Sequence, residues 1–455
     1  MTALNRTTVN APTAPVRLVH VGLGAFHRAH QVFYTQKAEA DPADPQWGYA
    51  SFSGRSAGIT PQLTAQDGLY TLVTRSGDGD SPELMTALVE ARGADETGRL
   101  VELLADPAVA VVTVTVTEAG YHLNEDLTLN RESPDIAADL ATLRTGELAP
   151  LKSAAGRIVA GLQARRAAGA GGMAVMSCDN IAANGETTRA SILGFAAALD
   201  AELADWIAGN VTFPSTSIDR ITPATTEELV ADVARQTGYE DAVPVVTEPF
   251  SSWVIQGEFP AGRPAWENAG VEFVEDIDTF ERRKLWLLNG AHSLLAYAGQ
   301  LKGYETVDEA IGDIELRERV EHLWEDAAEY LKTPGLGISD YKKALIERFQ
   351  NPRIRHSLAQ IGIDGGTKQR MRAVPILKAQ RSDNAMGHGA AYSIAAWITF
   401  LLKTDTIADT RAEELDRARH AEDPVAALLA ALDEDLAADT YALALVRTFV
   451  TELSR

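Results

Sequence analysis

The sequence predicts an α/β fold: a doubly wound, mostly parallel sheet in the N-terminal part, followed by a mainly α-helical C-terminal domain. Strand-like and helical segments alternate along the first part of the chain, and a glycine turn follows the first strand. Such alternation produces right-handed βαβ units. From residue 284 onward helical patterns dominate. We therefore expect two domains, residues 1–283 and 284–455, because the chain is too long for one ordinary core.

Short segments rich in β-branched residues mark the expected strands of the first domain. Arg17–Gly22 runs into the glycines, and Ala108–Thr117 has the composition of a strand buried on both faces of a parallel sheet. The other expected strands are Trp47–Ser53, 171–178, Val211–Pro214 and Val243–Thr247, and helical spacing covers 27–40, 153–169 and 189–207. A long helix-and-loop region is expected between the second strand and Ala108. The expected helices of the second domain are 284–301, 318–332, 340–349, 391–403 and 424–453.

Composition excludes several classes of function. The net charge of −23 would repel a phosphate backbone, so nucleic acid is not an expected partner. The single cysteine, Cys178, can form neither an internal disulfide nor a zinc site of paired thiolates, which suits a reducing compartment. Because we find no signal peptide and no span of about 18 apolar residues, we expect a cytoplasmic chain without membrane contact. A monomer or small homo-oligomer is expected.

The glycine turn indicates a cofactor. Gly22-Leu-Gly24-Ala-Phe-His27 follows a predicted strand and opens a predicted helix, which is the setting in which backbone approaches a pyrophosphate. His27 replaces the third glycine of the usual fingerprint, so the turn alone also fits an ordinary strand–turn–helix connection. The long βαβ alternation favours a Rossmann-like, dinucleotide-binding domain.

The end of the second strand bears on which dinucleotide binds. An acidic residue there would bind the free 2′-hydroxyl of NAD, but none occurs before Asp67. The segment Ser53-Gly54-Arg55-Ser56 instead offers a guanidinium and a hydroxyl that suit the 2′-phosphate of NADP. Arg55 fits a solvated loop residue equally well, so NAD and NADP both remain open.

A lysine, an amide and an imidazole lie close together in Lys284-Leu-Trp-Leu-Leu-Asn289-Gly-Ala-His292. In an α-helix, Asn289 and His292 lie about 140° and 80° around the axis from Lys284, so all three border one broad face. Such a polar face is costly unless it serves a function or meets water. The alternatives are a solvated lysine at a helix start, a packing histidine and a turn at Asn289-Gly290.

Segments along nearly the whole chain match, in collinear order, the motifs of one family. KLWLLNGAHS fits a pattern of lysine, asparagine five residues on and histidine three further, and Gly22 to Gln31 fits G-x-G-x-F-x-R-x-H-Q. Further matching segments are AQDGLYTLVTR, VTVTEAGY, SCDN, DRITPATT, TEPFSSWVI and FPAGRPAWENAGVEFVEDI. By these motifs the chain resembles the polyol-specific long-chain dehydrogenases, which include mannitol 2-dehydrogenase and fructuronate reductase.

The resemblance implies a metal-free alcohol dehydrogenase. It makes Lys284 the general base, lets Asn180 and Asn289 polarise the reacting oxygen, and gives His292 a role in orienting the substrate or the lysine. The chemistry is sound, because hydride leaves a carbinol carbon only as its hydroxyl loses a proton to a neutral amine. An unperturbed lysine with a pKa of about 10.4 is rarely neutral near pH 7, so burial or positive charge must lower its pKa. Two amide N–H groups then stabilise the alkoxide as an oxyanion hole does.

The resemblance also implies residues that bind the substrate, namely Asp219, Lys368 and Arg372. The last two stand in DGGTKQRMR where the family has D-G-S-x-K-[IL]-P-x-R, from which Gln369 and Arg370 depart. Asp219 also fits a helix-start cap before ITPATTEE. Together with the turn and the second strand, the motifs give the residues expected to bind the cofactor: Gly22, Gly24, Phe26, Arg28, Arg55, Ser56, Thr117 and Glu118.

For the reaction, the resemblance implies oxidation of a linear polyol to a ketose with NAD or NADP, with mannitol to fructose as the first expectation. Reduction of a hexuronate such as fructuronate to mannonate is the alternative, because Arg370 would suit a carboxylate unless it points to solvent. A catalytically idle nicotinamide-binding sensor is disfavoured by the presence of Lys284, Asn289, His292 and Asn180. Zinc-dependent oxidation is disfavoured by the single cysteine and the absence of HExxH spacing.

Overall fold

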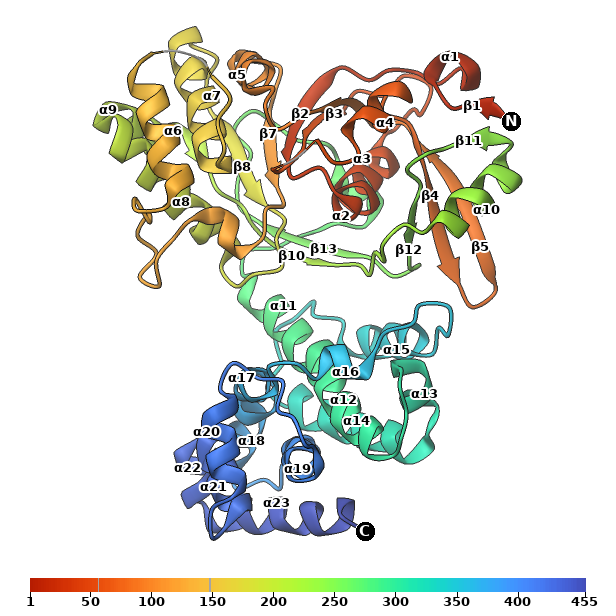
Figure 1. The fold of residues 1–455 in the computed structure, drawn as a ribbon, viewed down its shortest axis with the longest axis vertical. Helices are drawn as coiled ribbons and strands as arrows, with labels where there is room; N and C mark the ends of the chain where they lie inside the picture. The colour runs from red at the N-terminus through yellow and green to blue at the C-terminus, as the bar shows by residue number, and fades with distance from the viewer. Residues whose placement is uncertain (56, 147–148) are drawn as a thin grey trace. The chain divides into compact units, whose positions relative to one another are not determined.

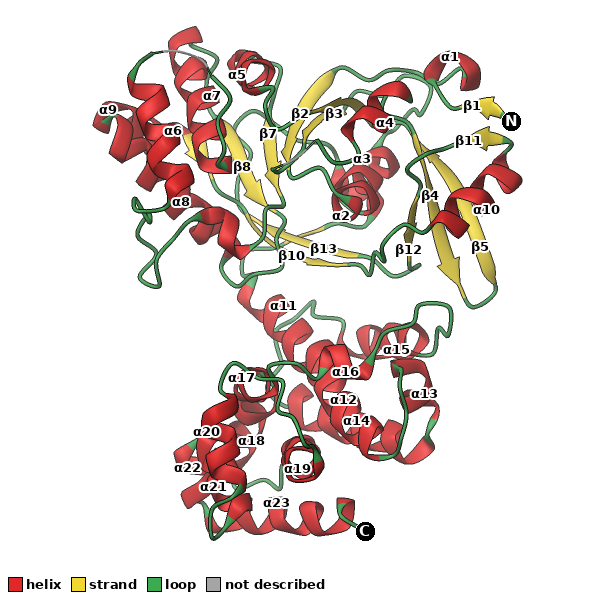
Figure 2. Cartoon of the chain, viewed as in Figure 1, coloured by secondary structure: helices red, strands yellow, loops and turns green. Residues whose placement is uncertain are grey.

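The computed structural model describes residues 1–55, 57–146 and 149–455, so the expected cofactor residue Ser56 lies outside the described residues. The chain forms two compact units, Met1–Ile277 and Asp278–Arg455, whereas the sequence pattern divides it after residue 283 (Figure 1). The first unit combines strands with helices, and the second is helical (Figure 2). The predicted fold class is confirmed.

Six strands form the main sheet of the first unit, and every neighbouring pair is parallel. Their order is β6 (Leu88–Arg92), β3 (Gly48–Phe52), β2 (Val16–Val21), β7 (Val111–Val114), β8 (Met173–Ser177) and β9 (Val211–Thr212). Numbered along the chain, this is the 3-2-1-4-5-6 order of the Rossmann fold. The order reverses between β2 and β7, and ligands of such sheets bind beyond the carboxyl ends of the strands at this point.

Both faces of the main sheet are covered. Alternate residues of a strand point to opposite faces, so Leu18 and Val19 of β2 belong to different apolar cores. One core includes residues of α2 (Ala25–Ala29) and α3 (Gln31–Ala38). The other includes residues of α5 (Thr97–Ala105), α6 (Pro134–Arg144), α7 (Ala154–Ala168), α8 (Asn184–Leu199) and α9 (Ala201–Asn210). Burial on both faces explains the β-branched composition of β7.

Smaller sheets complete the first unit. They are β12 (Val245–Thr247) with β4 (Tyr70–Ser76) and β5 (Gly79–Met85), β10 (Ser215–Asp219) with β13 (Ser252–Gln256) and β14 (Glu272–Phe273), and β1 (Thr2–Ala3) with β11 (Tyr239–Glu240). The expected strand 243–247 thus forms, but it pairs with β4 and not with the main sheet. The remaining helices of this unit are α1 (Arg6–Val9), α4 (Thr60–Ala65), α10 (Glu227–Thr237), η1 (Glu118–Tyr121) and η2 (Trp266–Ala269).

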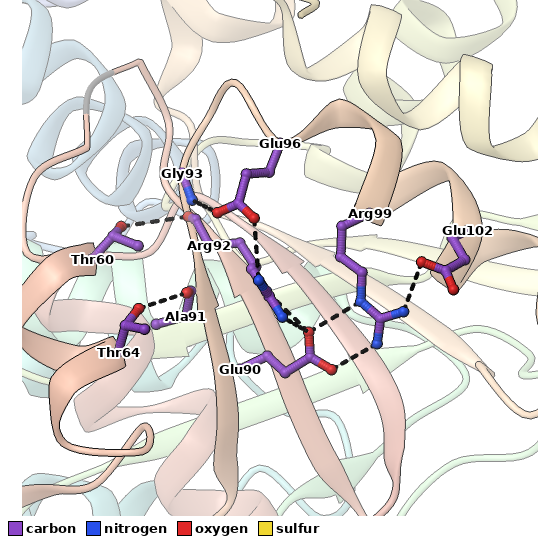
Figure 3. A network of polar contacts seen from close by, with 9 residues as sticks. All are labelled: Thr60, Thr64, Glu90, Ala91, Arg92, Gly93, Glu96, Arg99 and Glu102. Carbon is purple, nitrogen blue, oxygen red and sulfur yellow. Dashed lines mark hydrogen bonds and ion pairs between the residues drawn. The ribbon is translucent and has the colours of Figure 1, made fainter. Parts of the chain in front are cut away.

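The prediction that only helices and loops lie between β3 and β7 is wrong, because this region contains β4, β5 and β6. β5 has one buried residue, Met85, and contains Pro82, and β6 carries Glu90 and Arg92, so neither has the pattern of a buried strand. As an edge strand, β6 tolerates charge. Glu90 accepts hydrogen bonds from Arg92 and from Arg99 of α5, which satisfies the carboxylate (Figure 3).

Two expected helices of the first unit are each interrupted. The segment 27–40 breaks at His30, whose φ of −119° and ψ of −80° leave helical geometry between α2 and α3. The segment 189–207 breaks at Asp200, whose carboxylate accepts the N–H of Glu202 and caps α9. In both cases a local backbone change interrupts an otherwise helical apolar pattern.

The second unit is built around α12 (Gly290–Leu301) and α19 (His388–Lys403), which are buried over most of their length and pack together. The expected helix 424–453 consists of three shorter helices. Around the central pair lie α11 (Asp278–Arg283), η3 (Lys284–Asn289), α13 (Val307–Gly312), α14 (Ile314–Ala328), α15 (Ile338–Phe349), α16 (Leu358–Ile361), α17 (Gly365–Met371), α18 (Ala373–Ser382), α20 (Ala412–Arg419), α21 (Pro424–Leu432), α22 (Glu434–Ala438) and α23 (Thr440–Leu453). Among the described residues, no helix has the length and apolar character needed to cross a membrane.

Candidate functional site

The glycine turn follows β2 at the point where the strand order reverses. Gly22 has a φ of +117°, and a Cβ on it would lie 2.0 Å from the carbonyl oxygen of Thr115, so no side chain fits there. The N–H groups of Gly22 and Leu23 donate to the carbonyl of Phe52 at 2.8 and 2.9 Å, which holds the turn over β3. Beside Gly24, a Cβ would meet no atom outside its chain neighbours closer than 3.6 Å. The turn therefore leaves room for a pyrophosphate and fits a dinucleotide.

His27 stands in place of the third glycine and forms a buried polar layer between α2 and the sheet. Its ring stacks on that of His20 with 3.4 Å between centroids, and its Nε2 lies 2.9 Å from the hydroxyl of Ser51. His20 bonds the hydroxyl of Thr115, which donates to the carbonyl of Gly22 at 2.9 Å. Burial lowers the pKa of both rings, that of His20 to about 3, so both are neutral. This layer replaces the close glycine contact of the fingerprint and supports the turn.

Two more residues of α2 are expected to bind the cofactor, Phe26 and Arg28. Phe26 is half-buried and stacks on His30 with 5.0 Å between centroids. Arg28 is buried, and its guanidinium donates to the carbonyl of Val243 and lies 5.1 Å from the ring centroid of Tyr70. Burial lowers the pKa of Arg28 to about 10. These contacts fix the helix that follows the turn.

Ser53 and Arg55 follow β3, at the end of the sheet where a Rossmann fold binds the adenosine ribose. The hydroxyl of Ser53 is buried and has no hydrogen-bond partner in the described chain. Arg55 is exposed. The buried guanidinium of Arg157 donates to the carbonyls of Ser53 and Gly54 at 3.0 and 2.9 Å, and burial lowers its pKa to about 10. Arg157 thereby holds the loop that carries Arg55.

Four further expected residues lie at the carboxyl ends of strands. Thr117 and Glu118 follow β7, Asn180 follows β8, and all three are exposed. Asp219 is the last residue of β10 and is half-buried. It does not cap the next helix, since α10 begins at Glu227 with Thr226 as its cap. The helix-cap interpretation of Asp219 is therefore wrong.

Lys284 and Asn289 are the first and last residues of η3, which is a π-helix where the sequence pattern suggests an α-helix. A π-helix joins residues i and i+5, so residues five apart lie near each other on successive turns and not about 140° apart. Single π-helical turns occur frequently at functional sites. The alternative of a turn at Asn289-Gly290 is wrong, because Gly290 has helical angles and begins α12.

A cavity of about 270 Å³ lies within the second unit. Its lining consists of His292, His356, Gln360, Ile361, Lys368 and Arg372. The guanidinium of Arg372 donates to the carbonyl of Asn289 at 3.1 Å and to the hydroxyl of Ser293 at 2.8 Å. Lys368 donates to the carbonyl of Ile361 at 2.9 Å. The structure thus brings His292, Lys368 and Arg372 together and links them to the end of η3.

The described residues that line the cavity include two cations, Lys368 and Arg372, and no acidic side chain. Burial lowers the pKa of Arg372 to about 10, so its guanidinium stays protonated at neutral pH. Burial and the charge of Arg372 also lower the pKa of Lys368, against the opposing charges of Asp364 and Asp409. Burial, with the charges of His356 and Arg348, lowers the pKa of His292 far enough to keep its ring neutral. Cations that destabilise one another in this way favour an anionic ligand.

Arg370, a candidate from the sequence for binding a carboxylate, is exposed and does not line this cavity. Its charge acts on Glu414, whose pKa is lowered first by a hydrogen bond from Arg411 and further by Arg370. Lys368 and Arg372 are the cations that line the cavity.

Sequence reasoning missed His356 and Gln360, because both lie outside the matched motifs and far along the chain from His292. It also missed Glu281, one turn before Lys284. Burial and Asp278 raise the pKa of the Glu281 carboxyl, against the opposing charge of Lys284. In the described part of the chain, no group of three histidine, cysteine or acidic residues is arranged to hold a metal ion.

Comparison with known families identifies the fold and the class of enzyme. Residues 16–268 match the mannitol dehydrogenase Rossmann domain, and residues 276–454 match the mannitol dehydrogenase C-terminal domain. The chain belongs to the mannitol dehydrogenase family. The family resemblance and the prediction of an oxidoreductase are confirmed.

Relatives within this family differ in the substrate that they are named for. A D-mannonate oxidoreductase of Escherichia coli (strain K12) is 37% identical over 399 residues, which cover 86% of this chain and 80% of the relative. The structure of Pseudomonas fluorescens mannitol 2-dehydrogenase in a ternary complex with NAD and D-mannitol matches with a TM-score of 0.77 at 32% identity, covering 99% of this chain and 97% of the other. A substrate-free D-sorbitol dehydrogenase matches with a TM-score of 0.86 at 30% identity, covering 100% and 96%.

Proposed function

We propose that this chain moves a hydride between a nicotinamide dinucleotide and a secondary alcohol carbon of a linear, polyhydroxylated substrate. The observation that carries the proposal is the polar, cationic cavity of the second unit, in a chain whose first unit has a glycine turn that fits a dinucleotide. With the dinucleotide bound at the glycine turn, its nicotinamide would accept or supply the hydride. NAD is the proposed cofactor, as in the mannitol 2-dehydrogenase complex.

Protein side chains provide the acid–base chemistry. Lys284 acts as the general base that takes the hydroxyl proton of the substrate, and the amides of Asn180 and Asn289 stabilise the alkoxide that forms. Two observations support these roles: family membership, and the π-helix that brings Lys284 and Asn289 near each other. His292 is neutral, so it orients substrate hydroxyls by hydrogen bonding and not by charge. No metal ion takes part in this scheme.

Substrate binding is assigned to the cavity residues Lys368 and Arg372 and, in the first unit, to Asp219. Because the described residues that line the cavity include two cations and no acid, the best candidate is a hexonate that is interconverted with its ketohexuronate, as mannonate with fructuronate. The identity with the D-mannonate oxidoreductase agrees with this candidate. Interconversion of a hexitol and a ketohexose, such as mannitol and fructose, is the second candidate, which the two matched structures favour.

The first test compares kcat/KM for mannonate, mannitol and sorbitol with NAD. We expect mannonate to be the best substrate. Arg372→Gln and Lys368→Gln should each lower kcat/KM for mannonate by about 10- to 100-fold and for the hexitols by less, because a charge-assisted hydrogen bond is lost only with the acid. Arg370→Gln is the matched control, since Arg370 does not line the cavity. A higher kcat/KM for a hexitol than for mannonate would overturn the hexonate as the substrate and favour the hexitol.

Cofactor choice rests on the loop after β3. The first unit supplies Gly22 and Gly24 for the pyrophosphate and Thr117 and Glu118 for the nicotinamide half, with Phe26 and Arg28 acting through the position of α2. Arg55 is the one feature among the described residues of this loop that favours a 2′-phosphate, and NADP is therefore the alternative cofactor. Arg55→Asp should lower kcat/KM with NADP and leave that with NAD nearly unchanged. An unaltered ratio between the two cofactors would remove Arg55 from cofactor selection.

A further inference from the structure

A single buried carboxylate, Asp179, joins two chain segments at the carboxyl ends of β7 and β8. Its two oxygens accept hydrogen bonds from the N–H of Val116 at 3.0 Å and from the N–H of Thr117 at 2.9 Å. The hydroxyl of Tyr121 donates to the same carboxylate at 2.6 Å. Asp179 itself is only 8% exposed, whereas its neighbour Asn180 and the Thr117 that it holds are exposed. The carboxylate thus lies beneath residues that border the ligand crevice.

Thr117 has a backbone conformation that is essentially reserved for glycine. Its φ is +65° and its ψ is 164°, and a β-branched side chain makes this region still less favourable. Such a residue persists only when its surroundings hold it in place, and strained residues of this kind gather at ligand sites. Here the N–H bonds of Val116 and Thr117 to Asp179 supply the restraint.

Asp179 also fixes the chain immediately before Asn180. Its N–H donates to the hydroxyl of Ser177 at 3.1 Å, and its carbonyl accepts a hydrogen bond from the buried Asn184 at 3.0 Å. Asn184 also bonds the backbone of Thr216, through its amide oxygen at 2.9 Å and its amide nitrogen at 2.7 Å. The peptide that leads into Asn180 is therefore tied to β10 as well as to β7.

The position of Asp179 in the sheet indicates which half of the cofactor the segments after β7 and β8 face. In the Rossmann order the half that contains β2 and β3 binds the adenosine side, so the half that contains β7 and β8 lies on the nicotinamide side. We propose that Asp179 is a positioning residue for the reaction: it holds Thr117 in its strained conformation, so that Thr117 and Glu118 meet the nicotinamide half of the cofactor, and it fixes Asn180. This inference rests on the proposed function.

The carboxylate is chemically specific for this task. It accepts three hydrogen bonds, two from backbone N–H groups and one from a hydroxyl. An amide in its place would offer one accepting oxygen and one donating nitrogen, and the nitrogen would face groups that also donate. Asp179→Asn keeps the size of the side chain but releases part of the restraint on Val116 and Thr117.

The decisive variant is Thr117→Gly, because glycine removes the side chain and its strain but keeps the N–H that Asp179 binds. If Thr117 is held for cofactor binding, the variant keeps or raises Tm, yet its Kd for NADH increases about tenfold. Leu127→Gly is the matched control. Leu127 has a φ of +60° and is exposed, so glycine relieves a positive φ there outside the segment that Asp179 holds. Its Kd for NADH should equal that of the wild type.

Asp179→Asn and the double variant test whether Asp179 acts through Thr117. Asp179→Asn should weaken NADH binding and also lower kcat, whereas Thr117→Gly should act mainly on the Kd. Adding Thr117→Gly to Asp179→Asn should weaken NADH binding no further, since Asp179→Asn already displaces the side chain that glycine removes. An unchanged Kd in Thr117→Gly, with wild-type protein that binds NADH, would overturn this inference alone. Wild-type protein that binds neither NADH nor NADPH would overturn the proposed function and this inference with it.

Discussion

The glycine turn of the first unit and the cavity of the second are built from different parts of the chain. The turn is formed by backbone groups: the N–H groups of Gly22 and Leu23 donate to the carbonyl of Phe52, and Gly24 leaves space for a ligand. The cavity is formed by charged and polar side chains: Lys368 and Arg372 supply the charge, and His292 supplies a neutral ring. A site made of backbone is damaged by adding atoms, whereas a site made of side chains is damaged by removing a functional group.

The two sites also differ in the residues that hold them in place. The turn is held by a buried polar layer in which His20 reaches Gly22 through the hydroxyl of Thr115. In the cavity, Arg372 is both a proposed substrate-binding residue and a structural one, because it donates hydrogen bonds to Asn289 and Ser293. Substitutions in the first unit are therefore expected to change cofactor affinity, and those in the second to change turnover or substrate selection.

The largest effect is expected at Lys284. Lys284→Met removes the proposed base while keeping an unbranched side chain, and kcat should fall by about 100- to 10,000-fold. The Kd for NADH should stay within about twofold of the wild type, because the glycine turn belongs to the other unit. Steady-state kinetics and a fluorescence titration with NADH provide the two measurements.

The control for Lys284 is Lys302→Met, at the end of α12. Lys302 forms surface ion pairs with Asp313 at 2.9 Å and Glu315 at 2.6 Å and lines no part of the cavity. Its loss should leave kcat unchanged. Equal loss of activity in both variants would mean that positive charge at this unit matters and that a base at Lys284 does not.

The next largest effect is expected at Gly22. Gly22→Ala puts a Cβ 2.0 Å from the Thr115 carbonyl at a φ of +117°, so the turn must move. We expect NADH affinity to fall by about 100-fold, since a displacement of about 1 Å is enough for such a loss. Gly209→Ala in α9 is the control, because a Cβ there meets no atom within 4 Å and alanine favours a helix. NADH affinity that survives Gly22→Ala would contradict a site made of backbone.

The parts of the fold that follow from local patterns could be predicted from the sequence. Strand β7 has an uninterrupted β-branched run because both of its faces are buried, and the glycine turn is visible because Gly22 must have a positive φ. β6 could not be predicted, since its Glu90 and Arg92 are satisfied by a partner on α5 that the pattern of the strand does not contain.

The candidate site was predictable only in part for a similar reason. The spacing of Lys284 and Asn289 is evident in the sequence, but their proximity depends on a π-helix, which an α-helical period hides. The cavity joins His292 to His356 and Arg372, and this grouping arises from the packing of helices distant in sequence. Arg370 and Arg372 are both basic in the sequence, and only the structure distinguishes the exposed one from the buried one.

The smallest effect is expected at the rim of the main sheet, where charge supports stability without contributing to the turn. Glu90 bonds Arg99 at 2.7 Å and Arg92 at 3.0 Å, as Figure 3 shows. Burial raises the pKa of Glu90, but the hydrogen bonds and charges of Arg99 and Arg92 outweigh burial and lower it below its ordinary 4.5. Glu90→Gln should therefore cost about 0.5–1 kcal/mol in the free energy of unfolding at pH 7.

The pH dependence of this cost has a definite sign. Because the pKa of Glu90 is depressed in the folded chain, its stabilisation is present above pH 4.5 and is lost as the pH falls through the folded value. The difference in Tm between wild type and Glu90→Gln should thus shrink in acid, and NADH affinity at pH 7 should not change. Glu102→Gln is the control, since Glu102 pairs with Arg99 from a 70% exposed position and should contribute almost nothing. A Tm difference that grows in acid would contradict the lowered pKa of Glu90. Weaker NADH binding in Glu90→Gln would mean that charge at the sheet rim also shapes the backbone site.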